Sequence, residues 1–203
     1  MNGADLDMFA FENEAKKEGY KVVAGVDEAG RGPLAGPVVA AAVILPDEPI
    51  EGINDSKKLS EKKREALYDI IMERAVSVGV GYAEHGEIDE INILNAAMKA
   101  MARAVSALGV KPDFVLIDGN TSRFMDVPHR CIVKGDQKSA SVAAASIIAK
   151  VTRDRLMAEY AEKYPEYGFE KHKGYPTREH IRLVRELGPC EIHRRTFLKK
   201  IKY

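Results

Sequence analysis

Two adjacent carboxylates at the end of a hydrophobic segment have the clearest chemical potential in this sequence. Residues 22–26 are apolar and predict a β-strand, and Asp27 and Glu28 follow them directly. A glycine-flanked arginine, Arg31, comes next. Carboxylate oxygens are the ligands that hard divalent cations take, and glycine lets a backbone approach a ligand closely. The segment therefore predicts a metal site beside a loop that contacts an anion or a sugar, which suits chemistry on a phosphate-containing polymer.

Two further acids follow the same pattern. Asp118 ends the hydrophobic run 114–118, and Asp136 comes shortly after the strand-like segment 129–133. In sheets with crossover connections, functional groups tend to gather at the carboxyl ends of strands. Four acids there would repel one another unless they held cations, so we expect two divalent ions about 4 Å apart, clamping the attacking and leaving oxygens of a phosphodiester. An oxygen-only ligand set favours Mg²⁺ or Mn²⁺ over zinc.

Each acid also has a simpler interpretation. A single aspartate after a strand, such as Asp118, is commonly a turn residue, and Asp136 could serve the N-terminus of the helix that follows. Asp27 and Glu28 are harder to dismiss, because adjacent acids beside an apolar strand repel each other. Successive side chains of a strand point to opposite faces. The backbone should therefore bend at residues 29–30 if both carboxylates are to reach one site.

The apolar pattern predicts the elements that position these acids. Strands are expected at 22–26, 37–45, 76–82, 114–118 and 129–133, and helices at 60–74, 88–108, 139–164 and 176–187. The first three strands should be antiparallel, since a short connection joins the first two. The last two are reached by helical crossovers, and helices should cover the sheet. This is an α/β fold, with one domain over residues 1–165 and a helical C-terminal subdomain over 166–203.

Charge is distributed unevenly along the chain. The totals of 31 basic and 31 acidic residues give no net charge, which argues weakly against a nucleic-acid binder. Residues 137–203 hold 15 Lys/Arg and 8 Asp/Glu, leaving 16 and 23 for residues 1–136, so the two parts carry about +7 and −7. An acidic catalytic part joined to a basic part fits a metal enzyme with a polyanionic substrate. Exposed helices rich in Lys and Arg would give the same counts.

Composition indicates a soluble globular protein, with 45% hydrophobic and 31% charged residues. The longest apolar run, 38–45, falls well short of the roughly 20 residues of a membrane span, and residues 1–17 show no signal peptide. Cys131 and Cys190 are expected to be reduced thiols. We therefore expect a cytoplasmic protein that does not contact a membrane.

Two other segments could bind substrate. Lys57 precedes a predicted helix start and suits a phosphate backbone, although a solvated helix entry would look the same. Tyr175 lies in a basic loop, 172–177, where an aromatic ring can stack on a sugar or base or merely pack on the surface. The phosphate-binding pattern GxxxxGK[ST] is absent from the sequence, which removes a nucleotide-dependent switch from the candidates.

The motifs taken together resemble one known family, ribonuclease HII, over about residues 20–195. The matching segments are Gly25–Val38, Asp55–Leu59, Ile117–Gly119, Lys134–Asp136, Ala144–Asp154, His172–Tyr175 and Gly188–Pro189. The resemblance implies an RNase H-like fold: a five-stranded mixed sheet flanked by helices, with a helical C-terminal extension. It also implies an endonuclease that cleaves the RNA strand of RNA–DNA hybrids and nicks duplex DNA 5′ of an embedded ribonucleotide, leaving 3′-hydroxyl and 5′-phosphate ends. Ribonucleotide excision and RNA primer removal would be its roles.

The resemblance further implies a role for each candidate residue. Asp27 would bridge two Mg²⁺ or Mn²⁺ ions, Asp136 would help hold the ion that activates water, and Glu28 and Asp118 would hold the ion beside the leaving oxygen. The substrate-binding residues would be Gly30, Arg31 and Gly32 at the 2′-hydroxyl of the junction, Tyr175 on the next sugar, and Lys57 on a phosphate. The related ribonuclease HIII has an additional N-terminal domain, and only about 20 residues precede the first strand here.

Other functions compete with this one. A DNA resolvase or integrase on the same fold also gathers carboxylates around two metals, although a 2′-hydroxyl sensor has no use on pure DNA. A non-catalytic nucleic-acid-binding module would not need four acids, which repel a polyanion in the absence of metal. We expect a monomer that acts on RNA–DNA hybrids and on ribonucleotide-containing duplex DNA, with no obligate protein partner.

Overall fold

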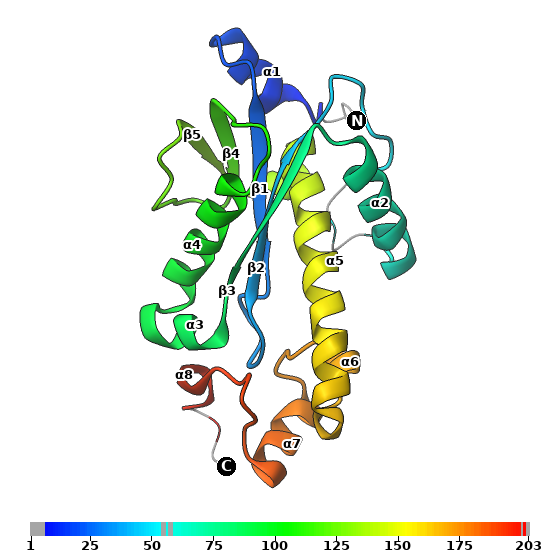
Figure 1. Cartoon of the computed structure of the whole chain (residues 1–203), viewed down its shortest axis with the longest axis vertical. Helices are drawn as coiled ribbons and strands as arrows, with labels where there is room; N and C mark the ends of the chain where they lie inside the picture. The colour runs from blue at the N-terminus through cyan, green and yellow to red at the C-terminus, as the bar shows by residue number, and fades with distance from the viewer. Residues whose placement is uncertain (1–6, 54–55, 57–58, 200, 202–203) are drawn as a thin grey trace, which may run out of the picture.

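The computed structural model describes residues 7–53, 56, 59–199 and 201. One five-stranded sheet, with strand order β3-β2-β1-β4-β5, forms its centre (Figure 1). The strands are β1 (Val23–Ala29), β2 (Val38–Ile44), β3 (Ser77–Ala83), β4 (Phe114–Asp118) and β5 (His129–Ile132). The helices are α1 (Ala10–Lys17), α2 (Glu61–Arg74), α3 (His85–Ile91), α4 (Ile93–Ser106), α5 (Ala140–Lys163), α6 (Phe169–His172), α7 (Arg178–Leu187) and α8 (Arg195–Leu198). Single 3₁₀ turns are η1 (Gly135–Gln137) and η2 (Pro165–Tyr167).

The strand directions match the predicted mixed sheet. β1 pairs antiparallel with β2, and β2 pairs antiparallel with β3. β4 lies parallel to β1, with Val26 opposite Ile117, and β5 lies parallel to β4. The carboxyl ends of β1, β4 and β5 therefore meet at one edge of the sheet, which is the arrangement that the four acids require.

The central strand β2 is buried along its whole length, as its continuous apolar sequence predicts. Ala40 and Ala42 pack in the core beneath α4, whereas Ala41 and Val43 pack beneath α2 and α5. Alternate residues thus enter two cores on opposite faces of the sheet. Small side chains on β2 and α5 let the long helix lie close to the sheet, which holds the end of β1 against α5.

The predicted helix 88–108 is wrong as a single element. It is divided into α3 and α4 by Asn92, whose φ of 66° is incompatible with a continuous helix. The Asn92 side chain accepts a hydrogen bond from the Asn95 backbone N–H at 3.1 Å and so caps α4. The apolar periodicity continues across this residue, which is why the pattern predicts one helix.

The helices after α5 gather at the end of the sheet where β1 turns into β2 (Figure 1). Their core combines Phe169, Val184 and Leu198 with Met157 from α5 and Ala35 from the β1–β2 connection. α5 thus packs both against the sheet and against the helices that follow residue 165. The predicted domain boundary at that residue stays a prediction. Within the described residues, no helix has the length and hydrophobicity that crossing a bilayer requires.

Candidate active site

β1 extends beyond the predicted end at residue 26, so that Asp27 and Glu28 lie inside the strand. Asp27 pairs with Ala41 and Glu28 with Ala40 in regular antiparallel register. The expected bend lies after both carboxylates, at Gly30, where φ is 96°. The two acids nevertheless line one hollow at the end of the strand, because the chain turns away immediately beyond them.

Asp27 is the buried member of the pair, with 4% of its surface exposed. Its Oδ1 accepts a hydrogen bond from the Glu28 backbone N–H at 2.7 Å. Burial raises the pKa of Asp27 well above its usual range, and the negative charges of Glu28 and Asp118 raise it further. Hydrogen bonds from Glu28 and Ser146 oppose this rise but do not cancel it. A group in this position gains strongly from a nearby cation.

Asp118 and Asp136 arrive from the two neighbouring strand ends. Asp118 is the last residue of β4, and its Oδ1 accepts a hydrogen bond from the Gly135 backbone N–H at 2.6 Å. Asp136 follows Gly135 directly and is 3% exposed. The chain enters this turn through Lys134, which has a left-handed φ of 58°. β1, β4 and the turn after β5 thus bring the four acids to the same edge of the sheet, and their shared role as metal ligands stays a prediction.

The donor set fits a hard divalent cation, because it offers only carboxylate oxygens and places several negative charges within electrostatic reach of a buried one. In the described part of the chain, however, no three Asp, Glu, His or Cys side chains converge closely enough to hold an ion as they stand. Binding would therefore have to draw the carboxylates inward. Relief of their mutual repulsion provides a driving force for that movement.

A hollow of about 230 Å³ joins Asp27 and Glu28 to the predicted substrate loops, whereas Asp118 and Asp136 are not part of its lining. Its lining consists of Asp27, Glu28, Ala29, Gly30, Arg31, Gly32, Ser56, Ser146, Lys150 and Tyr175. A Cβ atom added to Gly32 would lie 3.7 Å from Cε1 of Tyr175, so the two loops face each other across the hollow. Arg31 is exposed, and its Nη1 lies 3.4 Å from Oε1 of Glu28. Lys57 lies outside the described residues.

Three residues of this lining, Ser56, Ser146 and Lys150, were not among the predicted site residues. Ser146 and Lys150 lie one helical turn apart on α5, and the Ser146 hydroxyl is 2.6 Å from that of Ser56. Lys150 forms an ion pair with Asp154 at 2.6 Å. The i,i+4 spacing of Ser146 and Lys150 places both side chains on one face of the helix and could have indicated a shared site. The many small residues around them indicate packing instead.

A chain of hydrogen bonds through two buried histidines holds the main chain at Tyr175. Nδ1 of His180 lies 2.9 Å from the Tyr175 carbonyl oxygen and must donate to it, which leaves Nε2 to accept from Nε2 of His193 at 3.1 Å. Nδ1 of His193 then accepts from the Cys190 backbone N–H at 3.0 Å. Burial lowers the pKa of His180 to about 4 and that of His193 to about 3. Both rings are therefore neutral at physiological pH and serve a structural role.

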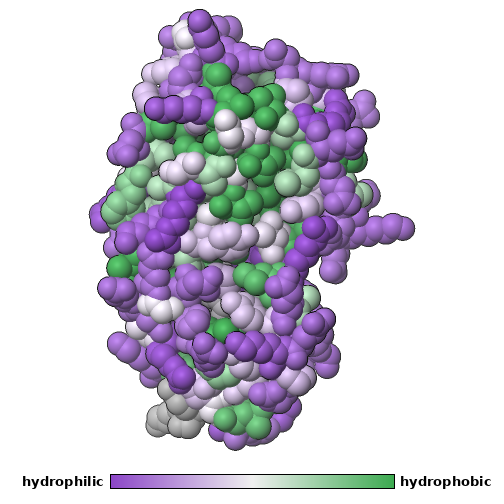
Figure 2. All heavy atoms as spheres, viewed as in Figure 1, coloured by the Kyte–Doolittle hydropathy of each residue, from purple (hydrophilic) through white to green (hydrophobic). Residues whose placement is uncertain are grey.

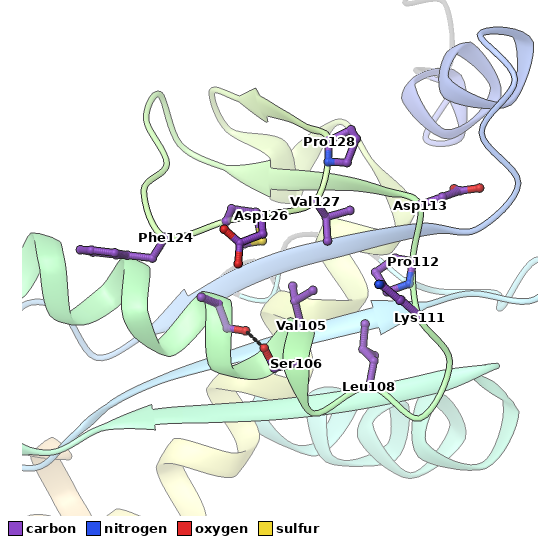
Figure 3. Close-up of a pocket in the computed structure, with 12 residues that line it drawn as sticks. Val105, Ser106, Leu108, Lys111, Pro112, Asp113, Phe124, Asp126, Val127 and Pro128 are labelled. Atoms are coloured by element: carbon purple, nitrogen blue, oxygen red, sulfur yellow. Dashed lines mark hydrogen bonds between the residues drawn. The ribbon is translucent and has the colours of Figure 1, made fainter.

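A larger cavity lies elsewhere, between the end of α4 and the β4–β5 connection, and has a volume of about 830 Å³ (Figure 3). Its ionisable groups are Lys111, Asp113 and Asp126. Asp113 accepts hydrogen bonds from the backbone N–H groups of Lys21 and Val22, so it fixes the start of β1. The face in Figure 2 likewise shows hydrophobic side chains gathered between α4 and α2, away from the C-terminal helices. Asp27, Glu28, Gly30–Gly32 and Tyr175 line the smaller hollow instead.

A mixed sheet of order 3-2-1-4-5, covered by helices and carrying acids at its strand ends, defines an RNase H-like nuclease. The profile of the ribonuclease HII family matches residues 24–200, and the chain belongs to that family of endonucleases, which hydrolyse RNA in RNA–DNA hybrids. Two similar relatives are the ribonucleases HII of Acetivibrio thermocellus (57% identical, covering 96% of this chain and 76% of the relative) and Caldicellulosiruptor saccharolyticus (54%, covering 98% of each). The crystal structure of ribonuclease H2 from Pyrococcus horikoshii is similar, with a TM-score of 0.72 and 32% identity over 87% of this chain and 93% of that one.

Proposed function

We propose that this protein, besides hydrolysing the RNA of RNA–DNA hybrids, nicks duplex DNA on the 5′ side of an embedded ribonucleotide and leaves 3′-hydroxyl and 5′-phosphate ends. One observation carries the proposal: a single hollow is lined by Asp27 and Glu28 together with Gly30–Gly32 and Tyr175. Acids for hydrolysis and a loop suited to reading a sugar are thus adjacent. Such a site can act where one ribose is present.

Asp27, Glu28, Asp118 and Asp136 would hold two divalent ions, Mg²⁺ or Mn²⁺. When bound, such ions activate water and stabilise the charge that develops on the leaving 3′-oxygen. The buried carboxylate of Asp27, whose pKa is raised by burial and by its acidic neighbours, would gain most from them. The hydrogen bond between Gly135 N–H and Asp118 orients one carboxylate and leaves its second oxygen for a cation.

Discrimination between ribose and deoxyribose would come from the loop 30–32 and Tyr175. A 2′-hydroxyl is both donor and acceptor and is the group that distinguishes RNA from DNA. Tyr175 is 40% exposed and faces Gly32 across the hollow, so its ring can pack on a sugar there. Removal of ribonucleotides and RNA primers from DNA is the cellular role that this specificity would serve.

A nicking assay tests the proposal directly. Two duplexes of the same sequence, one with a single ribonucleotide and one all-DNA, are incubated with the protein in Mg²⁺ or in EDTA. We expect a metal-dependent nick 5′ of the ribonucleotide and no cleavage of the control duplex. Cleavage of both duplexes would indicate a DNA nuclease on this fold, and binding without cleavage would indicate a non-catalytic module.

An Asp27→Asn variant completes the assay. We expect it to lose more than about 100-fold in rate, because even residues behind a metal ligand commonly contribute 10- to 100-fold. The matched control is Asp47→Asn, since Asp47 is an exposed surface residue paired with Lys16. Near-normal nicking by Asp27→Asn would refute the role of Asp27 as a metal ligand.

A further inference from the structure

Two arginines are buried behind the substrate loop. Arg153 of α5 is 1% exposed, and Arg194, just before α8, is 0% exposed. Each guanidinium donates three hydrogen bonds, all to main-chain carbonyl oxygens. Burying a charged group is costly unless its donors are satisfied, so six well-placed carbonyls explain how both side chains can lie inside. The carbonyls belong to the loops that line the hollow, which gives the arrangement a functional meaning.

Arg194 holds both ends of the β1–β2 connection. Its Nη2 donates to the Gly30 carbonyl at 2.6 Å, its Nη1 to the Arg31 carbonyl at 3.0 Å and its Nε to the Gly36 carbonyl at 2.9 Å. The planar guanidinium has donors in a fixed fork, so it sets the relative orientation of these three peptide groups.

These contacts determine where the loop's N–H groups point. In a planar trans peptide, the C=O of one residue and the N–H of the next point in opposite directions. Because the carbonyls of Gly30 and Arg31 are turned inward to Arg194, the N–H groups of Arg31 and Gly32 are turned away from it. Both residues line the hollow. The buried arginine thereby presents two main-chain donors to whatever occupies that hollow.

Arg153 connects this loop to the one that carries Tyr175. Its Nη2 and Nε donate to the carbonyls of Ala35 and Pro37 at 3.1 and 3.0 Å, and its Nη1 donates to the Lys173 carbonyl at 3.0 Å. The Tyr175 ring lies 5.8 Å from its guanidinium carbon. A Cβ atom on Gly30 would come within 2.1 Å of Nε of Arg153. Gly30 therefore makes room for the arginine, whatever it also does for substrate.

We propose that Arg194 and Arg153 are positioning residues that set the ribose selectivity of the enzyme. Arg194 turns the N–H groups of residues 31 and 32 toward the substrate, and Arg153 holds that loop in register with Tyr175. The proposal rests on the proposed function, because it assigns the 2′-hydroxyl contact to this loop. It adds two residues that do not touch substrate, contributed by helix α5 and by the segment before α8.

Both guanidiniums carry charge at neutral pH. Burial lowers the pKa of Arg153 to about 10, and burial together with the charge of Arg153 lowers that of Arg194 to about 9. Two positive charges in a low-dielectric interior, directly behind a loop that faces a polyanion, also favour the approach of phosphate. A neutral side chain with similar donors would lack this second contribution.

The test compares R194K with R155K. Lysine keeps the charge but loses the planar fork, and Arg155 is a matched control because it lies on α5 with its side chain 46% exposed and paired with Glu65. Two readouts are taken: amide hydrogen exchange in segments 30–37 and 173–175, and the ratio of cleavage rates on the single-ribonucleotide duplex and on an RNA–DNA hybrid. Partial unfolding would lower both rates together and leave their ratio unchanged.

We expect R194K to exchange faster in both segments and its rate ratio to fall by about tenfold or more, since small misplacements of substrate contacts commonly cost that much. R155K should match the unmodified protein. Unchanged exchange, or an unchanged ratio in spite of faster exchange, would overturn the proposal. If the unmodified protein does not nick the single-ribonucleotide duplex, the proposed function fails, and amide exchange alone then decides the loop-shaping role. R153K replaces R194K in the same experiment if R194K does not fold.

Discussion

Asp27 illustrates how one residue can link stability to function. Folding removes its carboxylate from water and places it near two other acids, so the folded protein favours the protonated form. A carboxyl whose folded pKa lies above its unfolded value stabilises the protein fully at low pH, and that stability is lost as pH rises through the folded pKa. The metal-free protein therefore carries a penalty at neutral pH that a bound cation would relieve.

This penalty can be measured by unfolding the protein in EDTA. Asp27→Asn removes the titrating group, so we expect it to be more stable than the unmodified protein at about pH 8 and to show little difference at about pH 4. Chemical denaturation at the two pH values gives the comparison. Asp47→Asn is the control, because the hydrogen bond and charge of Lys16 lower the pKa of Asp47. Its effect on the pH dependence of stability should therefore have the opposite sign. A difference between Asp27→Asn and the unmodified protein that does not change with pH would contradict the assignment.

The two glycines that flank Arg31 should respond differently to a methyl group. Gly30 has a φ of 96° and its Cβ would overlap Arg153, so we expect Gly30→Ala to lower the free energy of unfolding by more than about 2 kcal/mol. Gly32 has an ordinary φ, and the nearest atom to its Cβ would be 3.7 Å away. Gly32→Ala should therefore fold with nearly unchanged stability. Equal thermal stabilities for the two variants would refute the close approach of Arg153 to Gly30.

The local pattern singled out Asp27, Glu28 and Gly30–Gly32 because they follow a recognisable strand, and these residues line one hollow, while their roles stay predictions. Ser146 and Lys150 could not be predicted in the same way. Their α5 positions become meaningful only when the helix lies across β1, and small residues around them indicate packing. Arg153 and Arg194 resemble surface cations in sequence, and five of the six carbonyls that accept their hydrogen bonds lie more than 100 residues away.

At the scale of elements, the short connection between the first two strands was enough to predict their antiparallel pairing, and the parallel order of β1, β4 and β5 brings the strand-ending acids to one edge of the sheet. The start of α5 shows what such patterns cannot reveal. Ser139 caps the helix, because its side chain accepts a hydrogen bond from the Val142 backbone N–H. Glu12 of α1 also reaches this point, and its Oε1 accepts hydrogen bonds from the Ser141 backbone N–H at 3.0 Å and from the Ser139 and Ser141 hydroxyls.

We expect Glu12→Ala to lower the free energy of unfolding by about 2–3 kcal/mol, because three buried donors lose their acceptor at a helix N-terminus. Glu14→Ala is the control on the same helix, since Glu14 is exposed and pairs with Arg130. Such a surface pair is worth at most about 1 kcal/mol. Urea unfolding of the two variants decides the matter, and a Glu12→Ala variant as stable as Glu14→Ala would show that α1 does not anchor α5.

For the whole molecule, the class of fold and the opposition of an acidic and a basic part could be predicted from composition and order. The position of a domain boundary at residue 165 could not be derived from the sequence pattern alone, because the core of the C-terminal helices also contains Leu34 and Met157 from earlier segments. Counting charges along the sequence shows which part of the chain is basic. It does not show which basic side chains share a surface, because that depends on the tertiary structure.

The basic part predicts a strong dependence of substrate affinity on salt. Contacts between Lys or Arg and phosphates release counterions, so we expect KM for an RNA–DNA hybrid to rise about tenfold or more between roughly 50 and 200 mM monovalent salt. The value of kcat should change little over this range, since in the proposed mechanism the chemical step depends on the acids and not on phosphate contacts. Initial rates at fixed Mg²⁺ concentration give both constants. A KM that does not depend on salt would show that residues 137–203 make few phosphate contacts.

The hydrogen bond from Arg194 to the Gly30 carbonyl spans 164 positions of the chain. During synthesis, at about 5–20 residues per second, residue 194 is added roughly 10–30 s after Gly30. The strand-end acids are made first, and the loop beside them can reach its final shape only when the late segment arrives. A ribosome-bound chain that lacks this segment would thus carry the acids beside an unfinished loop 30–37, and translation would set the time at which the site is completed.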